Sequence, residues 1–321
     1  MSRPFSPRTR VSSYTSAWMP TGDVTAQFEG YIVGGSNASG ELSRIDKINF
    51  FDESKSVSSA TLSTARSSQG GAANSGVAGY SAGGYDTANI SAIDKITFFL
   101  DTKSTLSATL TTARNSLAGI ANSGTAGYFA GGADAGGRTS GIDKIAFPGD
   151  TKTTLAGTLT SGRNALASMS NSGTAGYFAG GFDGTNFLTG IDKIAFSADT
   201  KSTLAAVLAV GTREFHGMAN YGTAGYVGGG LDTSANISTI RKLTFSGETI
   251  ANLAATLSSA RRNGAAMANT GTAGYFCGGF DSVRVSGIDK ITFSNDAKST
   301  LSATLTDANY AQTGFANCGV L

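Results

Sequence analysis

Two charged residue types recur along the 321-residue chain at matching intervals. Aspartate and arginine can take part in acid–base chemistry, but a site that recurs five or six times around one structure is seldom a single active centre. We therefore interpret them as structural ion pairs, one within each repeat. The aspartates are Asp46, Asp94, Asp143, Asp192 and Asp289, and the arginines are Arg66, Arg114, Arg163, Arg213 and Arg261.

Two copies depart from this pattern. In the fifth copy, Arg241 replaces the aspartate, and one extra residue before Arg213 shifts the arginine. In the copy formed by the two ends of the chain, Asn309 replaces the arginine. We expect a hydrogen bond between Asn309 and Asp46 there.

His216 is the single histidine of the chain. The chain has no second histidine that could share a metal ion, and no cysteine or serine nucleophile stands beside His216. A role in metal binding or in nucleophilic catalysis therefore has little support. It stands at the start of a strand of small residues, next to Glu214, so we expect a half-buried side chain at the mouth of a central channel. The sequence predicts no catalytic residue, metal or cofactor, and Cys277 and Cys318 should be free thiols.

A third recurrent residue is an aspartate or asparagine two residues after a glycine pair. These positions lack the dense alternation of oxygen ligands that a calcium loop needs. We therefore expect side-chain caps on loop backbone, as in Asx-turns. They are Asn37, Asp86, Asp134, Asp183, Asp232 and Asp281.

All these residues belong to units that share a Gly-Tyr-x-x-Gly-Gly stretch. Six tyrosines mark it at intervals of 48 or 49 residues, a period typical of four-stranded propeller blades. Each glycine pair should end a strand where positive φ or close packing is required. The tyrosines are Tyr31, Tyr80, Tyr128, Tyr177, Tyr226 and Tyr275.

One unit predicts four strands in order. Residues 118–122 form a small-residue inner strand, residues 126–132 the second, residues 142–147 the third and residues 153–159 the outer strand. The chain begins with strands two to four of one blade and ends with an unaccompanied strand one, residues 314–317. We predict an all-β, six-bladed propeller in which this C-terminal strand completes the first blade.

The predicted propeller domain spans residues 26–321, and residues 1–25 match no part of the repeat. Their aromatic and arginine side chains favour an extended arm that docks on a neighbouring subunit, with an unstructured tail as the alternative. The residues that suggest anchoring are Arg8, Arg10, Tyr14 and Trp18.

Composition restricts the partners. The chain is 40 % hydrophobic and 14 % charged, with a formal net charge of +2, so we predict no nucleic-acid partner. No stretch approaches 18 apolar residues, and we predict neither a signal peptide nor membrane insertion. The 44 glycines and four prolines fit tight turns between short strands.

The repeat resembles the kelch repeats of galactose-oxidase-like propellers in three features. These are the glycine pair after an apolar strand, the arginine about 18 residues before it and the repeat period of 48 or 49 residues. The copper chemistry of galactose oxidase does not carry over, because that site needs two histidines. The pairing of Gly-Tyr-Phe-Ala-Gly-Gly with Ile-Asp-Lys-Ile more closely resembles propeller repeats of tailed bacteriophages. That resemblance implies a virion structural protein of a tail, fibre, neck or capsid decoration.

The loops between strands two and three differ in every copy, whereas the other hairpin turns are nearly identical. Varied loops on a rigid scaffold commonly carry binding. We expect a non-enzymatic virion protein whose arm binds other virion proteins and whose varied loops contact a host glycan, host protein or subunit. The alternative is an extracellular or cell-surface carbohydrate-binding lectin. The candidate binding residues are Tyr85, Arg138, Asn186, Phe187, Arg284 and His216.

Overall fold

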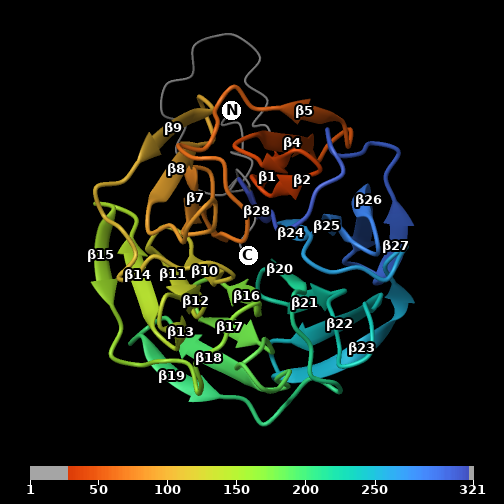
Figure 1. Cartoon of the computed structure of the whole chain (residues 1–321). Helices are drawn as coiled ribbons and strands as arrows, with labels where there is room; N and C mark the ends of the chain where they lie inside the picture. Colours follow the sequence, from red (N-terminus) through yellow and green to blue (C-terminus); the bar gives the residue numbers. More distant parts are fainter. Residues whose placement is uncertain (1–27, 318–321) are drawn as a thin grey trace, which may run out of the picture.

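The computed structural model describes residues 28–317, which form 28 β-strands and no helix (Figure 1). Six four-stranded antiparallel sheets surround a central axis, so the described part of the chain is a six-bladed β-propeller. The predicted arm residues and Cys318 lie outside the described residues. We number the blades from the one that holds β1.

In every blade the strands pair in a simple sequence from the axis outward. The innermost strands are β28 (Thr313–Ala316), β6 (Gly70–Asn74), β10 (Ala118–Asn122), β16 (Ala167–Asn171), β20 (His216–Asn220) and β24 (Ala265–Asn269). The second strands are β1 (Glu29–Val33), β7 (Ala78–Ala82), β11 (Ala126–Ala130), β17 (Ala175–Ala179), β21 (Ala224–Gly228) and β25 (Ala273–Phe280).

The outer half of each blade is built in the same way. The third strands are β4 (Ile45–Asn49), β8 (Ile93–Thr97), β14 (Ile142–Ala146), β18 (Ile191–Ala195), β22 (Thr239–Thr244) and β26 (Arg284–Thr292). The outermost strands are β5 (Lys55–Val57), β9 (Thr102–Thr105), β15 (Thr151–Thr154), β19 (Thr200–Thr203), β23 (Thr249–Thr256) and β27 (Ala297–Thr300). Two short ribbons, β2 (Ser36–Asn37) with β3 (Gly40–Glu41) and β12 (Ala133–Asp134) with β13 (Gly137–Arg138), lie in second-to-third-strand loops.

The C-terminal strand closes the ring. β28 pairs antiparallel with β1, from Gly30 opposite Ala316 to Val33 opposite Thr313, and completes blade one. Phe315 of β28 is fully buried, and its ring lies where a side chain on Gly79 of blade two would be. The predicted closure is therefore confirmed.

Several predicted strand bounds are wrong. The second and third strands of blade three end at Ala130 and Ala146, earlier than the predicted residues 132 and 147, and the C-terminal strand is residues 313–316, not 314–317. The outer strand of blade three is residues 151–154, not 153–159, because Asp150 takes a positive φ of 49° and ends the turn two residues early. The following segment leaves the ladder so that Leu159 can enter the core, where it is 2 % exposed.

The glycine pairs explain how a blade contacts the next one. Both glycines of each pair have positive φ, as the sequence predicted. A Cβ on Gly131 would lie 2.6 Å from the carbonyl oxygen of Arg163, and the amide of Gly132 donates to that same oxygen at 2.9 Å. The pair thus ends strand two in blades one to five and shifts the register of β25 in blade six, and Gly132 binds the arginine that opens the neighbouring blade.

The core lies between blades, and the repeated tyrosine links them twice. The ring of Tyr80 stacks on Phe147 of the next blade with centroids 4.9 Å apart, and its hydroxyl donates to Asp150 at 2.8 Å. Lys95 contacts the same carboxylate at 2.7 Å. Burial and Asp150 raise the pKa of Tyr80, so its hydroxyl stays a donor.

We call this tyrosine–acid–lysine contact the interblade lock, and it occurs six times. In the other five locks, Tyr31 and Lys47 bind Asp101, Tyr128 and Lys144 bind Asp199, Tyr177 and Lys193 bind Glu248, Tyr226 and Lys242 bind Asp296, and Tyr275 and Lys290 bind Glu53. The last one joins blade six to blade one. The locks therefore continue across the seam where the chain closes.

The recurrent aspartates and arginines form buried ion pairs within blades. Arg163 lies 3.0 Å from Asp192, and both side chains are at most 3 % exposed. Burial opposes ionisation of Asp192, but hydrogen bonds from Thr160 and the charge of Arg163 outweigh it and lower its pKa. The equivalent pairs are Arg66–Asp94, Arg114–Asp143 and Arg261–Asp289.

Blade five carries a reversed arrangement. Thr212, not Arg213 as the sequence predicted, occupies the arginine position, and Arg241 donates to its hydroxyl at 3.3 Å. Ala209 replaces the threonine or serine that serves the aspartate elsewhere, and Asn252 replaces the strand-four threonine. The aspartate and its partners have therefore changed together.

The expected hydrogen bond from Asn309 to Asp46 is not formed. Asp46 receives bonds from the amide and hydroxyl of Thr306, and Arg44 Nε lies 3.3 Å away. Asn309 Oδ1 is buried without a hydrogen-bond partner. A different arginine, from the loop of blade one, thus supplies the positive charge.

Candidate functional site

The varied loops and the connections between blades lie at one end of the ring, which we call the loop face. The connection into blade three reaches the blade-two loop, where Arg114 donates its amide to Ile90. The nearly identical hairpin turns lie at the opposite end, the turn face, where the amide of Phe98 donates to Val77. The predicted division of loops and turns between two faces is confirmed.

The sharpest feature of the loop face is a cluster of two arginines and two phenylalanines between blades three, four and five. Phe182 lies between the guanidinium groups of Arg138 and Arg213, 4.6 and 5.1 Å from its ring centre. Phe187 meets Phe182 edge-on at 5.4 Å and also carries Arg213 over its ring. Cation–π contacts fix these side chains in a ready-made surface.

A second cluster joins the loop of blade six to the segment entering blade one. Arg284 lies over the ring of Tyr310 at 5.2 Å, and Arg262 over Phe280 at 5.5 Å. The two rings are 5.9 Å apart. Arg284 Nε is buried without a hydrogen-bond partner.

The remaining candidates are exposed and separate. Tyr85 is 41 % exposed on the blade-two loop, and Asn186 is exposed at the tip of the blade-four loop. The structure thus brings Arg138 and Phe187 together and keeps Tyr85 and Arg284 apart from them. Sequence analysis did not name Phe182 or Arg213 as binding candidates. The signal was present, because the position of Phe182 is non-aromatic in some other blades and the position of Arg213 is uncharged in some others.

Five of the six predicted side chains after the glycine pairs cap loop backbone, whereas in the blade-two loop the Asp86 side chain forms no such cap and only its backbone amide donates, to Ala88. Asp183 Oδ1 accepts from the amides of Thr185 and Asn186 at 2.8 and 2.7 Å, which lowers its pKa. Equivalent caps are formed by Asn37, Asp134, Asp232 and Asp281. Within residues 28–317, no group of three or more histidine, cysteine, aspartate or glutamate side chains could hold a metal ion.

A ring of backbone hydrogen bonds surrounds the axis at the loop face. In each blade, one residue just before the inner strand has φ between 52° and 59°, and its amide donates to the equivalent carbonyl of the adjacent blade at 2.5–2.8 Å. We call this ring the collar. Its members are Ser68, Ser116, Ala165, Glu214, Asn263 and Ala311.

His216 lies just inside the collar, as the sequence predicted. Its Nε2 accepts from the amide of Gly264 at 2.5 Å, which requires the neutral ring. Burial and the nearby charge of Arg261 lower the pKa of His216 to about 3. Other blades carry a longer residue at the Gly264 position, so the glycine leaves room for the imidazole.

We expect His216 to make stability depend on pH. The folded protein keeps it neutral, while the unfolded chain binds a proton near pH 6.5, so stability is lost as pH falls below 6.5. The contribution is at most about 1.4 kcal/mol per pH unit. Melting temperatures from pH 7 to 4.5 should fall more steeply for the wild type than for His216→Ala, which copies Ala167; parallel curves would contradict this.

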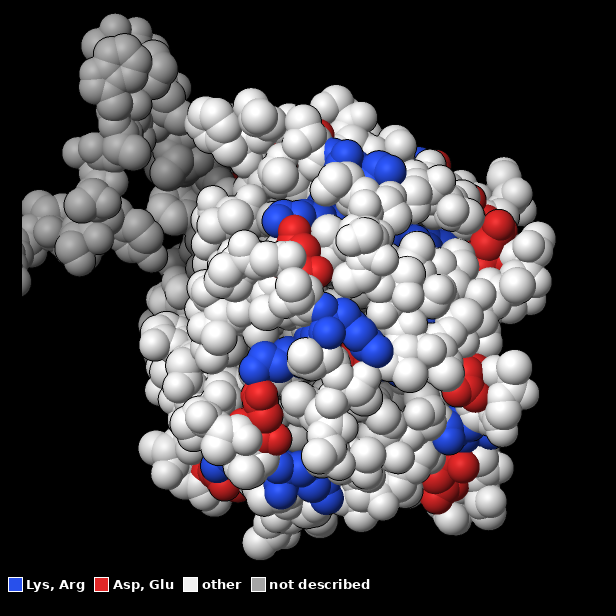
Figure 2. Space-filling model, turned by 90° about the vertical axis from the view of Figure 1, so that its left-hand side faces the viewer, with Lys and Arg blue, Asp and Glu red and all other residues white. Residues whose placement is uncertain are grey.

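Charges are mixed elsewhere on the surface. Figure 2 shows small neighbouring groups of basic and acidic side chains on the side of the ring that carries β15, amid a largely uncharged surface. Among the described residues, no helix has the length and hydropathy needed to cross a membrane.

No protein-family model matches the chain, and no curated protein is significantly similar to it. Fold and side-chain geometry define the class: a six-bladed propeller with a repetitive turn face and an individual loop face.

Proposed function

We propose that the protein is a non-enzymatic structural and interaction protein of a bacteriophage virion that presents its loop face to a host glycan, a host protein or another subunit. The observation that carries the interaction role is the contrast between the two faces. Six interblade locks make the ring rigid and repetitive at the turns, whereas the loop face displays different side chains in each blade. A rigid ring with preformed loops loses little entropy on binding.

The virion setting and the kelch-like type of repeat are supported by the sequence pattern alone. The lock gives that pattern a physical meaning, because the tyrosine of one motif and the lysine of the other bind one carboxylate. In this proposal, the N-terminal segment anchors the propeller to other virion proteins, in a tail, fibre, neck or capsid decoration. The loop face then points away from the anchor's partner.

Alanine at Phe187 and at Arg284 should weaken partner or host binding at least about tenfold, the loss expected for aromatic and arginine hot spots. Both side chains are half-buried at the loop face, Phe187 in a loop and Arg284 at the first residue of β26, so the melting temperature should change little. Binding is measured with purified particles or with the isolated propeller on host cells.

The matched control is Tyr221→Ser. Tyr221 is 54 % exposed on the turn face, and serine stands at the same position in blades two to four. Its replacement should leave binding unchanged. If Tyr221→Ser weakens binding and the loop variants do not, the turn face is the interaction surface.

Removing residues 1–21 should leave a folded propeller that no longer joins its assembly. All 24 strands of the six blades come from residues 29–316, so the blades do not use this segment. Folding is checked by thermal unfolding and incorporation by quantifying the protein in purified particles. Normal incorporation of the truncated protein would show that the propeller docks by itself.

A further inference from the structure

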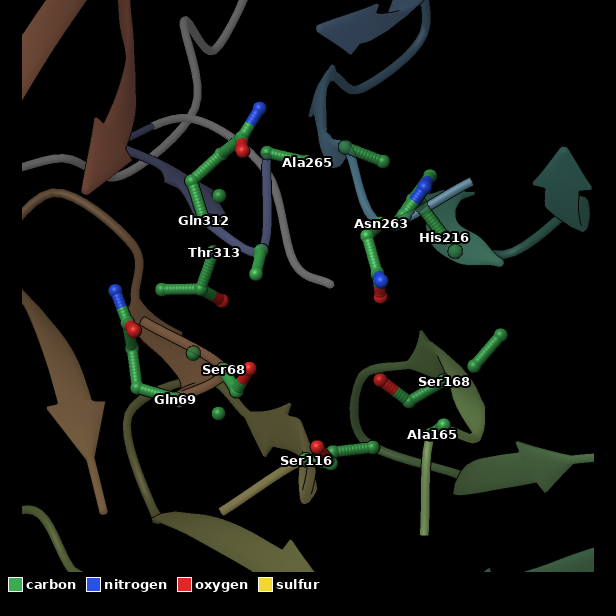
Figure 3. A pocket seen from close by; sticks show the side chains of 18 of the residues that line it. Ser68, Gln69, Ser116, Ala165, Ser168, His216, Asn263, Ala265, Gln312 and Thr313 are labelled. Atoms are coloured by element: carbon green, nitrogen blue, oxygen red, sulfur yellow. The ribbon is translucent and has the colours of Figure 1, made fainter. Parts of the chain in front are cut away.

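The collar surrounds a cavity of about 110 Å³ at the centre of the loop face (Figure 3). Every blade contributes to its wall. The lining segments are residues 68–71, 116–119, 165–168, 214–217, 263–266 and 311–314.

The lining is polar but nearly uncharged. Glu214 is its one charged residue. That carboxylate already contacts Arg213 Nε at 3.5 Å and Arg262 Nε at 3.3 Å, and it accepts a hydrogen bond from the side-chain Nδ2 of Asn263 at 3.1 Å. His216 is neutral at physiological pH. The cavity thus offers no free charge to a phosphate, a carboxylate or a cation.

What it offers is hydroxyl and amide groups. Figure 3 shows the side-chain oxygens of Ser68, Ser116, Ser168 and Thr313, and the amide of Asn263, directed toward the middle of the cavity. Ser116 and Ser168 donate to Asn115 Oδ1 and Gly119 O, which leaves them as acceptors.

Thr313 supplies the strongest single observation. It is only 9 % exposed, and neither its hydroxyl nor that of Ser68 forms a hydrogen bond with another residue of the range 28–317. Ser68 is half-buried, and neither hydroxyl is among the enclosed polar atoms of residues 28–317, so both open on the cavity and are free to bind a ligand or water there.

The ring does not need these side chains to close. Alanine or glycine stands at the Thr313 position in four blades, and glycine stands at the Ser168 position in four. The polar groups are therefore additions to an inner wall that folds without them.

We propose that the cavity binds a small neutral polyhydroxylated ligand, either a free polyol or sugar or the terminal unit of a neutral glycan. Such a ligand matches donors and acceptors without bringing charge. The volume is roughly that of seven to ten water positions, so ordered water can be replaced by hydroxyl groups that repeat its hydrogen bonds. This site lies inside the collar and uses neither Phe187 nor Arg284, so it does not depend on the proposed function of the loop clusters.

The test is binding of glycerol, free neutral pentoses and hexoses, and arrayed neutral glycans to the whole protein, by ligand-observed NMR and array fluorescence. The variant Thr313→Ala/Ser168→Gly uses only residues found at the same positions in other blades, and its melting temperature verifies folding. We expect at least a tenfold loss of binding in this variant and none in Tyr221→Ser.

If only arrayed glycans bind, the ligand is the end of a glycan. If free sugars or glycerol bind, the ligand is a soluble molecule. Either result supports the site, provided that the Thr313→Ala/Ser168→Gly variant loses the binding. The proposal is overturned if no neutral ligand binds, if the variant binds as well as the wild type, or if a sugar acid binds equally well. Phe187→Ala and Arg284→Ala should leave this binding intact. The result for the cavity can therefore be told apart from the result for the loop face as an interaction surface.

Discussion

Arg163→Ala should lower the free energy of unfolding by about 3–5 kcal/mol, because the buried carboxylate of Asp192 loses its buried cation and keeps only the more exposed Lys201. Asp192 is 1 % exposed, and Arg163 also donates to the carbonyl of Phe178 at 3.1 Å. Thr160 and Lys201 would still contact the carboxylate, which keeps the loss within this range. Urea unfolding of the purified protein measures the change.

A double-mutant cycle identifies the cause. Arg163→Ala/Asp192→Ala should lose less than the sum of the single variants, since no lone buried charge remains. Blade five supplies a second control: Thr212→Ala should cost about 1 kcal/mol, the value of an ordinary hydrogen bond. Additive single losses would show that the pair is not coupled.

Deleting residues 312–321 should abolish soluble, monomeric folding. The deletion removes β28, exposes the edge of β1 and strips the core of Phe315, whose burial alone contributes about 1.5–3 kcal/mol. Blade two loses the ring that packs on Gly79 as well. Size-exclusion chromatography and thermal unfolding measure the outcome.

A permuted chain provides the control. Residues 309–317 are placed before residue 29 through Ser-Gly-Thr, the turn that joins β10 to β11, and the chain then ends at residue 308. This chain should fold, since blade one regains its inner strand in the usual hairpin. A cooperatively folded, monomeric deletion protein would contradict closure by β28.

The period and the glycine pairs were sufficient to predict the propeller and its closure. Strand order followed from the small residues of the inner strands, which pack so closely that a Cβ on Gly119 would lie 2.1 Å from the carbonyl of Gly71. The end of the outer strand could not be predicted, because Asp150 ends its turn with a positive φ that few non-glycine residues adopt.

Contacts between blades were harder to predict. The interblade lock joins residues about 55 and 70 positions apart, such as Lys95 and Tyr80 with Asp150, and each looks like ordinary strand or turn chemistry in isolation. The collar consists of backbone groups and leaves no side-chain signature. The sequence did show that blade five departs from the pattern, because Arg241 stands where the other blades carry an aspartate.

The most direct test of the loop face as the interaction surface is hydrogen exchange of the protein, free and in its assembly or bound to its partner. The account predicts slower exchange in the assembly at residues 182–190 and 280–287. The turns at residues 197–199 and 246–248, on the opposite face and across the ring from β1 (Figure 1), should exchange at the same rate in both states. Protection confined to those turns, with the loops unchanged, would contradict it.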